Sequence, residues 1–166
     1  MTVRVAHITD VHFTESVGIT RLSPKRMLGT ANQYLRGRRH HFPEDVQRAL
    51  VDHILLVNPD VLVITGDLTA QALQSEFEKA RSFLQPILDA LPTVVMPGNH
   101  DLYTWGARDT DRIAAYFGNW MHRDGPIGIF RHEHVDVVAL DPNRPTYVNA
   151  SGLVPPAQLE ALEGYL

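Results

Sequence analysis

The chain has 166 residues, of which 44% are hydrophobic and 20% are charged, a composition typical of a globular domain with a hydrophobic core. The formal net charge of -4 gives no overall attraction to nucleic acid or to an anionic membrane. Because there is no cysteine, disulfides and thiolate metal ligands are excluded, and a bound metal would depend on His, Asp, Glu, Asn or water.

Nothing in the sequence predicts secretion or membrane insertion. The first residues, MTVRVAHITD, become polar too early for a signal peptide, and no apolar run approaches the ~18 residues that span a bilayer. We therefore expect a cytoplasmic protein. The chain also has no internal repeat or low-complexity tract, which predicts a single domain over residues 1–166.

The first two thirds of the chain alternate between strand-like and helix-like patterns. Short apolar runs rich in β-branched residues at 3–9, 61–65 and 93–96 are typical of buried strands. Between them, residues 44–57 and about 73–90 carry apolar side chains at helical spacing. This order of strands and helices predicts an α/β fold with a mainly parallel sheet.

The last third of the chain has a different pattern. Residues 110–117 predict a short helix, and the runs at 127–130 and 135–140 predict a hairpin. Residues 155–166 predict a final helix that proline opens.

Polar residues follow each of the three predicted parallel strands. They are Asp10 and His12 after the first strand, Asp67 after the second, and Asn99 and His100 after the third. The carboxyl ends of parallel strands meet at one edge of the sheet, which is where such sheets bind their ligands. We therefore expect these five side chains to lie together.

Their chemistry indicates a metal centre. On an extended strand Asp10 and His12 would share a face and could converge on one ion. Asp67 would supply a carboxylate able to touch two ions, and Asn99 a neutral amide oxygen. Two cations held ~3.5–4 Å apart can activate a water for attack at phosphorus. His100 could reach the substrate, to protonate a leaving oxygen or stabilise phosphoryl charge.

Each motif alone also fits an ordinary turn, since Pro, Gly, Asn and Asp are the usual turn formers. Their order, spacing and strand-end placement are more specific in combination. D-x-H at residues 10–12, G-D at 66–67 and G-N-H-D at 98–101 together resemble the calcineurin-like metallophosphoesterase superfamily. The resemblance is specific from residue 3 to about 103 and weaker toward the C-terminus.

The resemblance implies a four-layer α/β/β/α sandwich of two sheets flanked by helices. It also implies two divalent or trivalent metal ions, of Fe, Mn or Zn. By this likeness Asp10 and His12 would bind the first ion and Asp67 would bridge the two. Asn99 would bind the second ion.

The same resemblance implies hydrolysis of phosphate mono- or diesters, as in a phosphodiesterase. By this likeness His100 would be the catalytic imidazole. Asp101 would orient the ring of His100 through a hydrogen bond, as carboxylates orient imidazoles at other metal sites.

The sequence lacks two motifs that complete the family site, a later His and a Gly-His-x-His pair. We therefore expect a domain incomplete at its C-terminus, with too few metal ligands and an exposed sheet edge that association with a partner would cover. The alternative to an active enzyme is a catalytically impaired remnant. Such a remnant would bind a metal or a phosphate, or serve as an interaction module.

Three other histidines could be metal ligands or structural residues. His132 and His134 could replace the missing pair, although their place before an apolar run favours an exposed hairpin turn. His53 lies on the apolar face of the helix predicted at 44–57, which indicates a core or boundary histidine.

Residues 20–41 form a basic insertion with six Arg or Lys residues and no acidic residue. Apolar residues recur inside it at helical spacing, which predicts a basic amphipathic helix. Its charges could remain in water, contact a phosphoester substrate such as a nucleotide or a lipid-linked phosphate, or contact a membrane surface. The sequence carries no specific nucleic-acid signature.

Overall fold

The computed structural model describes residues 2–14, 43–102, 105–143 and 151–166. The basic helix predicted at residues 20–41 lies outside the described residues, so it stays a prediction. The single domain predicted for residues 1–166 also stays a prediction.

The three predicted parallel strands form one sheet. Its strands are β1 (Val5–Ile8), β2 (Val61–Ile64) and β3 (Thr93–Val95), in the order β1-β2-β3. Both pairs are parallel, as predicted. The register aligns Ile8 with Ile64 and Ile64 with Val95, so all three strands end at the same edge.

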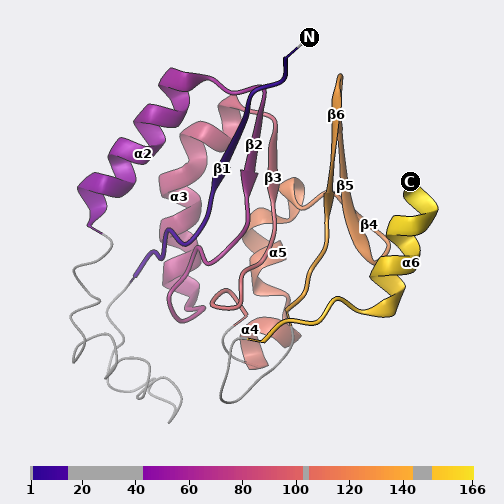
Figure 1. The fold of residues 1–166 in the computed structure, drawn as a ribbon. Coiled ribbons are helices and arrows are strands. Elements are labelled where there is room, and N and C mark those ends of the chain that lie inside the picture. Colours follow the sequence, from indigo (N-terminus) through magenta and orange to yellow (C-terminus); the bar gives the residue numbers. More distant parts are fainter. Residues whose placement is uncertain (1, 15–42, 103–104, 144–150) are drawn as a thin grey trace.

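Two long helices connect these strands and cover one face of the sheet (Figure 1). They are α2 (Glu44–Val57) and α3 (Gln74–Ala90), both at the predicted places. The core that they enclose includes Phe13, Phe77 and Leu84, each at most 1% exposed. A sheet covered by helices explains why β2 and β3 are continuous apolar runs rather than alternating ones.

The buried face of α2 differs from the predicted one. His53 is exposed and Val46 is 59% exposed, whereas Gln47, Val51 and Ile54 are buried. The prediction for His53 was therefore wrong. The physical reason is a hydrogen bond of 3.0 Å from the Gln47 amide to the carbonyl of Val11. Because this bond satisfies the polar side chain of Gln47 inside the core, the helix face that carries Gln47 is the buried one.

The short helix predicted at 110–117 corresponds to α5 (Arg112–Phe117). A break separates α5 from α4 (Trp105–Asp109), a helix that was not predicted, and the 3-10 turn η3 (Gly118–Trp120) follows α5. The break falls at Asp111, whose φ of 44° is left-handed and cannot continue a right-handed helix.

The C-terminal third forms a second, antiparallel sheet. Its strands are β4 (Arg123–Asp124), β5 (Ile127–His132) and β6 (Val135–Ala139), so the predicted hairpin is confirmed. The last helix, α6 (Pro156–Tyr165), packs on the outer face of this sheet, where the Tyr165 hydroxyl donates to Asp136 and Arg131 lies over the Tyr165 ring.

Figure 1 shows four layers, in the order α2 with α3, the parallel sheet, the antiparallel sheet and α6. The His122 ring nitrogen Nε2 lies 2.9 Å from the carbonyl of Thr93, which links β3 to the chain entering the second sheet. The predicted α/β fold with a metallophosphoesterase-like α/β/β/α arrangement is confirmed.

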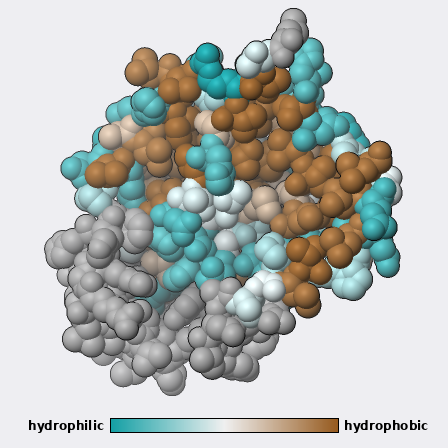
Figure 2. Space-filling model, in the orientation of Figure 1, coloured by the Kyte–Doolittle hydropathy of each residue, from teal (hydrophilic) through white to brown (hydrophobic). Residues whose placement is uncertain are grey.

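The parallel sheet has an open edge within the part of the chain that the structure describes. There β1 pairs only with β2, and the Val5 side chain is 48% exposed. Figure 2 shows hydrophobic residues gathered over the two sheets on this side, with hydrophilic residues below them. Among the described helices, none is long and apolar enough to cross a bilayer.

Candidate metal centre

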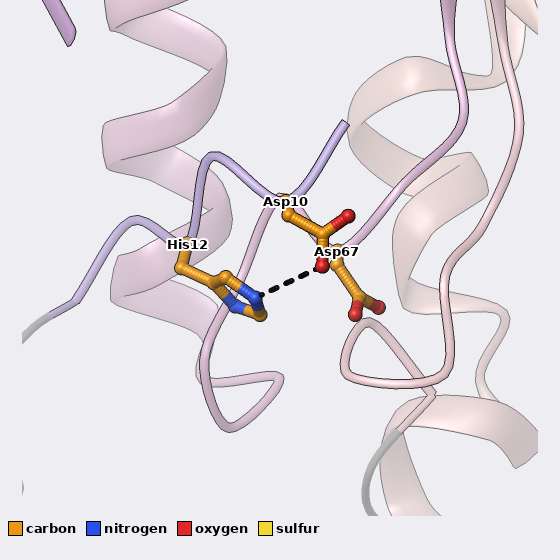
Figure 3. Close-up of side chains that lie close together, drawn as sticks. All are labelled: Asp10, His12 and Asp67. Carbon is orange, nitrogen blue, oxygen red and sulfur yellow. Dashed lines mark ion pairs between the residues drawn. The ribbon is translucent and has the colours of Figure 1, made fainter. Parts of the chain in front are cut away.

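Three of the predicted ligands converge beyond the parallel sheet. Asp10, His12 and Asp67 each offer a ligand atom, and these atoms all lie within 4.8 Å of one another. Figure 3 shows the three side chains pointing toward a common point, with His12 Nε2 3.5 Å from Asp10 Oδ1. The prediction that the side chains after the strands lie together is therefore confirmed for Asp10, His12 and Asp67.

The reason for their convergence differs from the predicted one. Strand alternation does not apply, because β1 ends at Ile8, before both Asp10 and His12. Instead Asp10, His12 and Asp67 have φ values of 57°, 48° and 50°. This left-handed conformation costs about 1–2 kcal/mol for a residue with a side chain, and such residues cluster at functional sites.

Backbone hydrogen bonds hold these strained residues in place. The amide of Asp10 donates to Gly66 O at 3.2 Å, and the amide of His12 donates to Asp67 O at 3.0 Å. The amide of Phe13 then donates to Leu68 O at 2.7 Å. The two chain segments thus run side by side past the strand ends, which brings the first two ligands against the third.

The loop after β3 packs directly on Asp67. A Cβ atom at Gly66 would lie 1.9 Å from the Gly98 nitrogen, and one at Gly98 would lie 2.1 Å from Asp67 Oδ1, so only glycine fits at both positions. The amide of His100 donates to Asp67 Oδ1 at 2.9 Å. Asn99 is exposed between these two contacts, beside Asp67, and its role as a ligand stays a prediction.

Two imidazoles lie next to each other in this centre. The rings of His12 and His100 are 4.9 Å apart and nearly perpendicular. Burial lowers the pKa of His12 below its usual value, and the neighbouring His100 lowers it further. A lowered pKa keeps His12 neutral near pH 7, the form in which an imidazole binds a metal.

Asp101 does not make the contact expected of it. The Nδ1 atom of His100 lies 2.8 Å from the carbonyl of Ala70, so the backbone holds the ring. Asp101 is fully buried and accepts from the amide and hydroxyl of Thr69 at 2.9 and 3.0 Å, and from the amide of Gly98 at 3.0 Å. It therefore joins the loop after β2 to the loop after β3.

The geometry agrees with a comparison against known families. A family model described as calcineurin-like phosphoesterase matches residues 3–159. The chain belongs to this family. The same chain has no match among curated proteins. Calcineurin-like phosphoesterases are generally hydrolases that bind metal ions, and the matched range contains every predicted site residue.

Removal of the Asp101 carboxylate should destabilise this calcineurin-like phosphoesterase fold. Asp101→Ala would leave the buried amide of Thr69 and the amide of Gly98 without their acceptor. Burial raises the pKa of Asp101 to about 6, a sign that its own desolvation offsets part of this stabilisation. We expect the free energy of unfolding in urea to fall by about 2–4 kcal/mol.

The matched control is Asp52→Ala, which removes an exposed carboxylate from α2 and should change the free energy of unfolding by less than about 0.5 kcal/mol. Equal unfolding midpoints for the two variants would contradict the role of Asp101 in joining the loops.

His132 and His134 lie at the hairpin turn between β5 and β6. In Figure 1 this turn lies at the level where β1 begins, away from the carboxyl ends of the parallel strands. His134 is exposed, with its Nε2 3.9 Å from Glu133. The described metal-ligand group includes neither residue, which does not support their replacement of the missing pair. The exposed-turn interpretation is confirmed for His134, whereas His132 is the last residue of β5 and is half-buried.

A cavity of about 190 Å³ borders the loop after β3. Its walls come from both sheets and α6, and include Met96, Pro97, Met121 and Gln158. None of the predicted ligands lines this cavity. The metal-ligand group is therefore separate from this cavity.

Proposed function

We propose that the chain is a metal-dependent phosphoesterase that hydrolyses a phosphate mono- or diester with metal-activated water. The convergence of Asp10, His12 and Asp67 at the carboxyl ends of β1 and β2 carries this proposal. The family match supports it, because calcineurin-like phosphoesterases are generally hydrolases. A phosphodiesterase reaction is the specific form that we propose to test.

The donor set fits the metal ions that the resemblance implies. Carboxylate, amide and imidazole ligands accept Fe, Mn and Zn, and the lowered pKa of His12 favours its metal-binding form. We propose two ions, the first held by Asp10 and His12, the second by Asn99, and both by Asp67. When bound, such ions supply Lewis acidity and a water of lowered pKa.

His100 would act on the substrate rather than on a metal. Its Nδ1 contacts the carbonyl of Ala70, so its Nε2 is the nitrogen that can exchange a proton with a phosphoester oxygen. The amide of His100 donates to Asp67, which places the ring immediately beside the metal-ligand group. This arrangement suits protonation of a leaving-group oxygen or stabilisation of phosphoryl charge.

We also propose a substrate class, a partner and a location for the protein. A nucleotide or a lipid-linked phosphate is the substrate class that the basic residues 20–41 favour, with membrane contact as a second use of the same charges. Association with a partner across the open edge of β1, and a cytoplasmic location, belong to the same proposal.

A second candidate function is a metal- or phosphate-binding module without catalysis. The observation that favours it is the size of the described metal-ligand group, which consists of three residues, Asp10, His12 and Asp67. The fold of such a module would not depend on catalysis, because backbone hydrogen bonds hold Asp10 and His12 against the loop after β2.

Metal loading followed by an activity assay separates the two. After loading with Mn²⁺ or Fe²⁺, elemental analysis should find about two ions per chain, and the loaded chain should hydrolyse an aryl phosphodiester. Metal binding without hydrolysis would favour the binding module. Zero metal and zero hydrolysis would contradict both the enzyme and the metal-binding form of the module.

A further inference from the structure

Two successive backbone carbonyls contact the two imidazoles of the site. His12 Nδ1 lies 3.3 Å from Thr69 O, and His100 Nδ1 lies 2.8 Å from Ala70 O. A carbonyl can only accept a hydrogen bond, so each neutral ring must carry its proton on Nδ1. The Nε2 atom of His12 then has a lone pair that can bind a metal, and the Nε2 atom of His100 is the site where a proton is gained or lost.

These carbonyls belong to a loop that lies between β2 and α3 and has no regular strand or helix structure. Residues 69–73 are all buried, so their peptide groups cannot exchange hydrogen bonds with bulk water. Ala72 has a φ of 54°, and its carbonyl accepts from Arg112 Nη1 at 2.6 Å. The direction of each peptide group in this loop therefore depends on partners elsewhere in the chain.

Glu76 is one such partner and lies on the first turn of α3. Its Oε2 accepts from the amide of Gln71 at 2.9 Å and from the amide of Leu73 at 3.1 Å. Its side chain is only 1% exposed. A buried carboxylate is unfavourable unless donors satisfy it, and these two loop amides are such donors.

A single peptide plane connects Glu76 to His100. The amide of Gln71 and the carbonyl of Ala70 belong to the same planar, trans peptide group, in which N–H and C=O point in opposite directions. When the N–H points at Glu76 Oε2, the C=O must point the other way, and there it meets His100 Nδ1. Rotation of this plane would break both hydrogen bonds together.

We infer that Glu76 is a positioning residue for the catalytic imidazole. By holding the peptide between Ala70 and Gln71, it sets the orientation and the tautomer of His100. This inference rests on the proposed function for its catalytic consequence, but the tautomer itself does not depend on activity.

The first test is NMR spectroscopy of the metal-free chain, with long-range ¹H–¹⁵N correlations of the imidazole rings. The spectra are recorded at about pH 8.5, where an ordinary imidazole is neutral and its two tautomers give distinguishable correlations. The protonated nitrogen of His100 should be Nδ1. A dominant Nε2–H tautomer in the unaltered chain would overturn the inference, whatever the variants do.

The second test compares three variants by the same spectra and by kinetics of the metal-loaded chain. Glu76→Ala should populate both tautomers of His100 and lower kcat by about 10–100-fold, with KM and metal content little changed. Glu76→Gln keeps an oxygen that can accept from both amides, so it should restore the Nδ1–H tautomer and most of kcat. Glu78→Ala removes an exposed carboxylate of the same helix and should change neither.

The outcomes separate the two proposals. A folded Glu76→Ala chain with an unchanged His100 tautomer would contradict the positioning role, even if hydrolysis is observed. If no hydrolysis is found in any variant but the tautomer of His100 shifts in Glu76→Ala, the positioning role stands and the proposed enzymatic function fails. If Glu76→Ala does not fold, loss of the Nδ1–H tautomer in Glu76→Gln contradicts the inference and its retention supports it.

Discussion

Replacement of His100 with alanine is expected to lower kcat for phosphodiester hydrolysis by about 10²–10⁴-fold, the usual contribution of a general acid or base. The bound metal should remain, because the described ligand group consists of Asp10, His12 and Asp67. The measurements are steady-state kinetics and elemental analysis on the same loaded sample.

His53→Ala is the matched control, since His53 is an exposed histidine on α2. It should leave kcat and metal content unchanged. An active His100→Ala chain would remove His100 from the mechanism. Loss of metal in that variant would instead make His100 a metal ligand.

Replacement of Gly98 with alanine is expected to disrupt both the fold and the metal centre. The added Cβ would lie 2.1 Å from Asp67 Oδ1 and 2.2 Å from the Asp67 nitrogen. To relieve this overlap, the backbone of one loop or the side chain of Asp67 would have to move. We expect the free energy of unfolding to fall by about 3 kcal/mol or more, the upper range for overpacking. Metal content should fall in parallel, because Asp67 must shift.

Gly164→Ala provides the control for this substitution. Gly164 lies in α6, and apart from its own helix backbone and chain neighbours no described atom lies within 4 Å of the position that its Cβ would take. Alanine there should stabilise the chain by roughly 0.5–1 kcal/mol, because glycine is unfavourable inside a helix. A Gly98→Ala chain with the unfolding midpoint and metal content of the unaltered chain would show that the two loops do not pack as described.

The sequence alone determined the architecture because the relevant signals are local. The apolar runs of β2 and β3 are buried on both faces, so their composition is enough to predict parallel strands. The helix at Glu44–Val57 lies between Pro43 and Asn58-Pro59, which mark its ends in the sequence. Placement of Asp10 and Asp67 at one sheet edge then follows from the parallel topology.

Tertiary structure alone decided which face of α2 is buried. Val46 and Val51 both belong to stripes at helical spacing, and periodicity cannot choose between two adjacent stripes. The hydrogen bond from Gln47 to Val11 makes the choice, across 36 residues of sequence. His53 is therefore exposed although it lies on an apolar pattern.

The role of the buried Asp101 carboxylate and the orientation of the His100 ring were likewise decided by partners distant in the chain. Asp101 bonds Thr69, 32 residues away, and the Ala70 carbonyl bonds His100, 30 residues away. The left-handed φ of His12 is held by hydrogen bonds to a neighbouring chain segment rather than by any element of local sequence. The sequence thus identified the candidate ligands by type and position, whereas their orientation depends on hydrogen bonds that form only when the loops after β1, β2 and β3 meet.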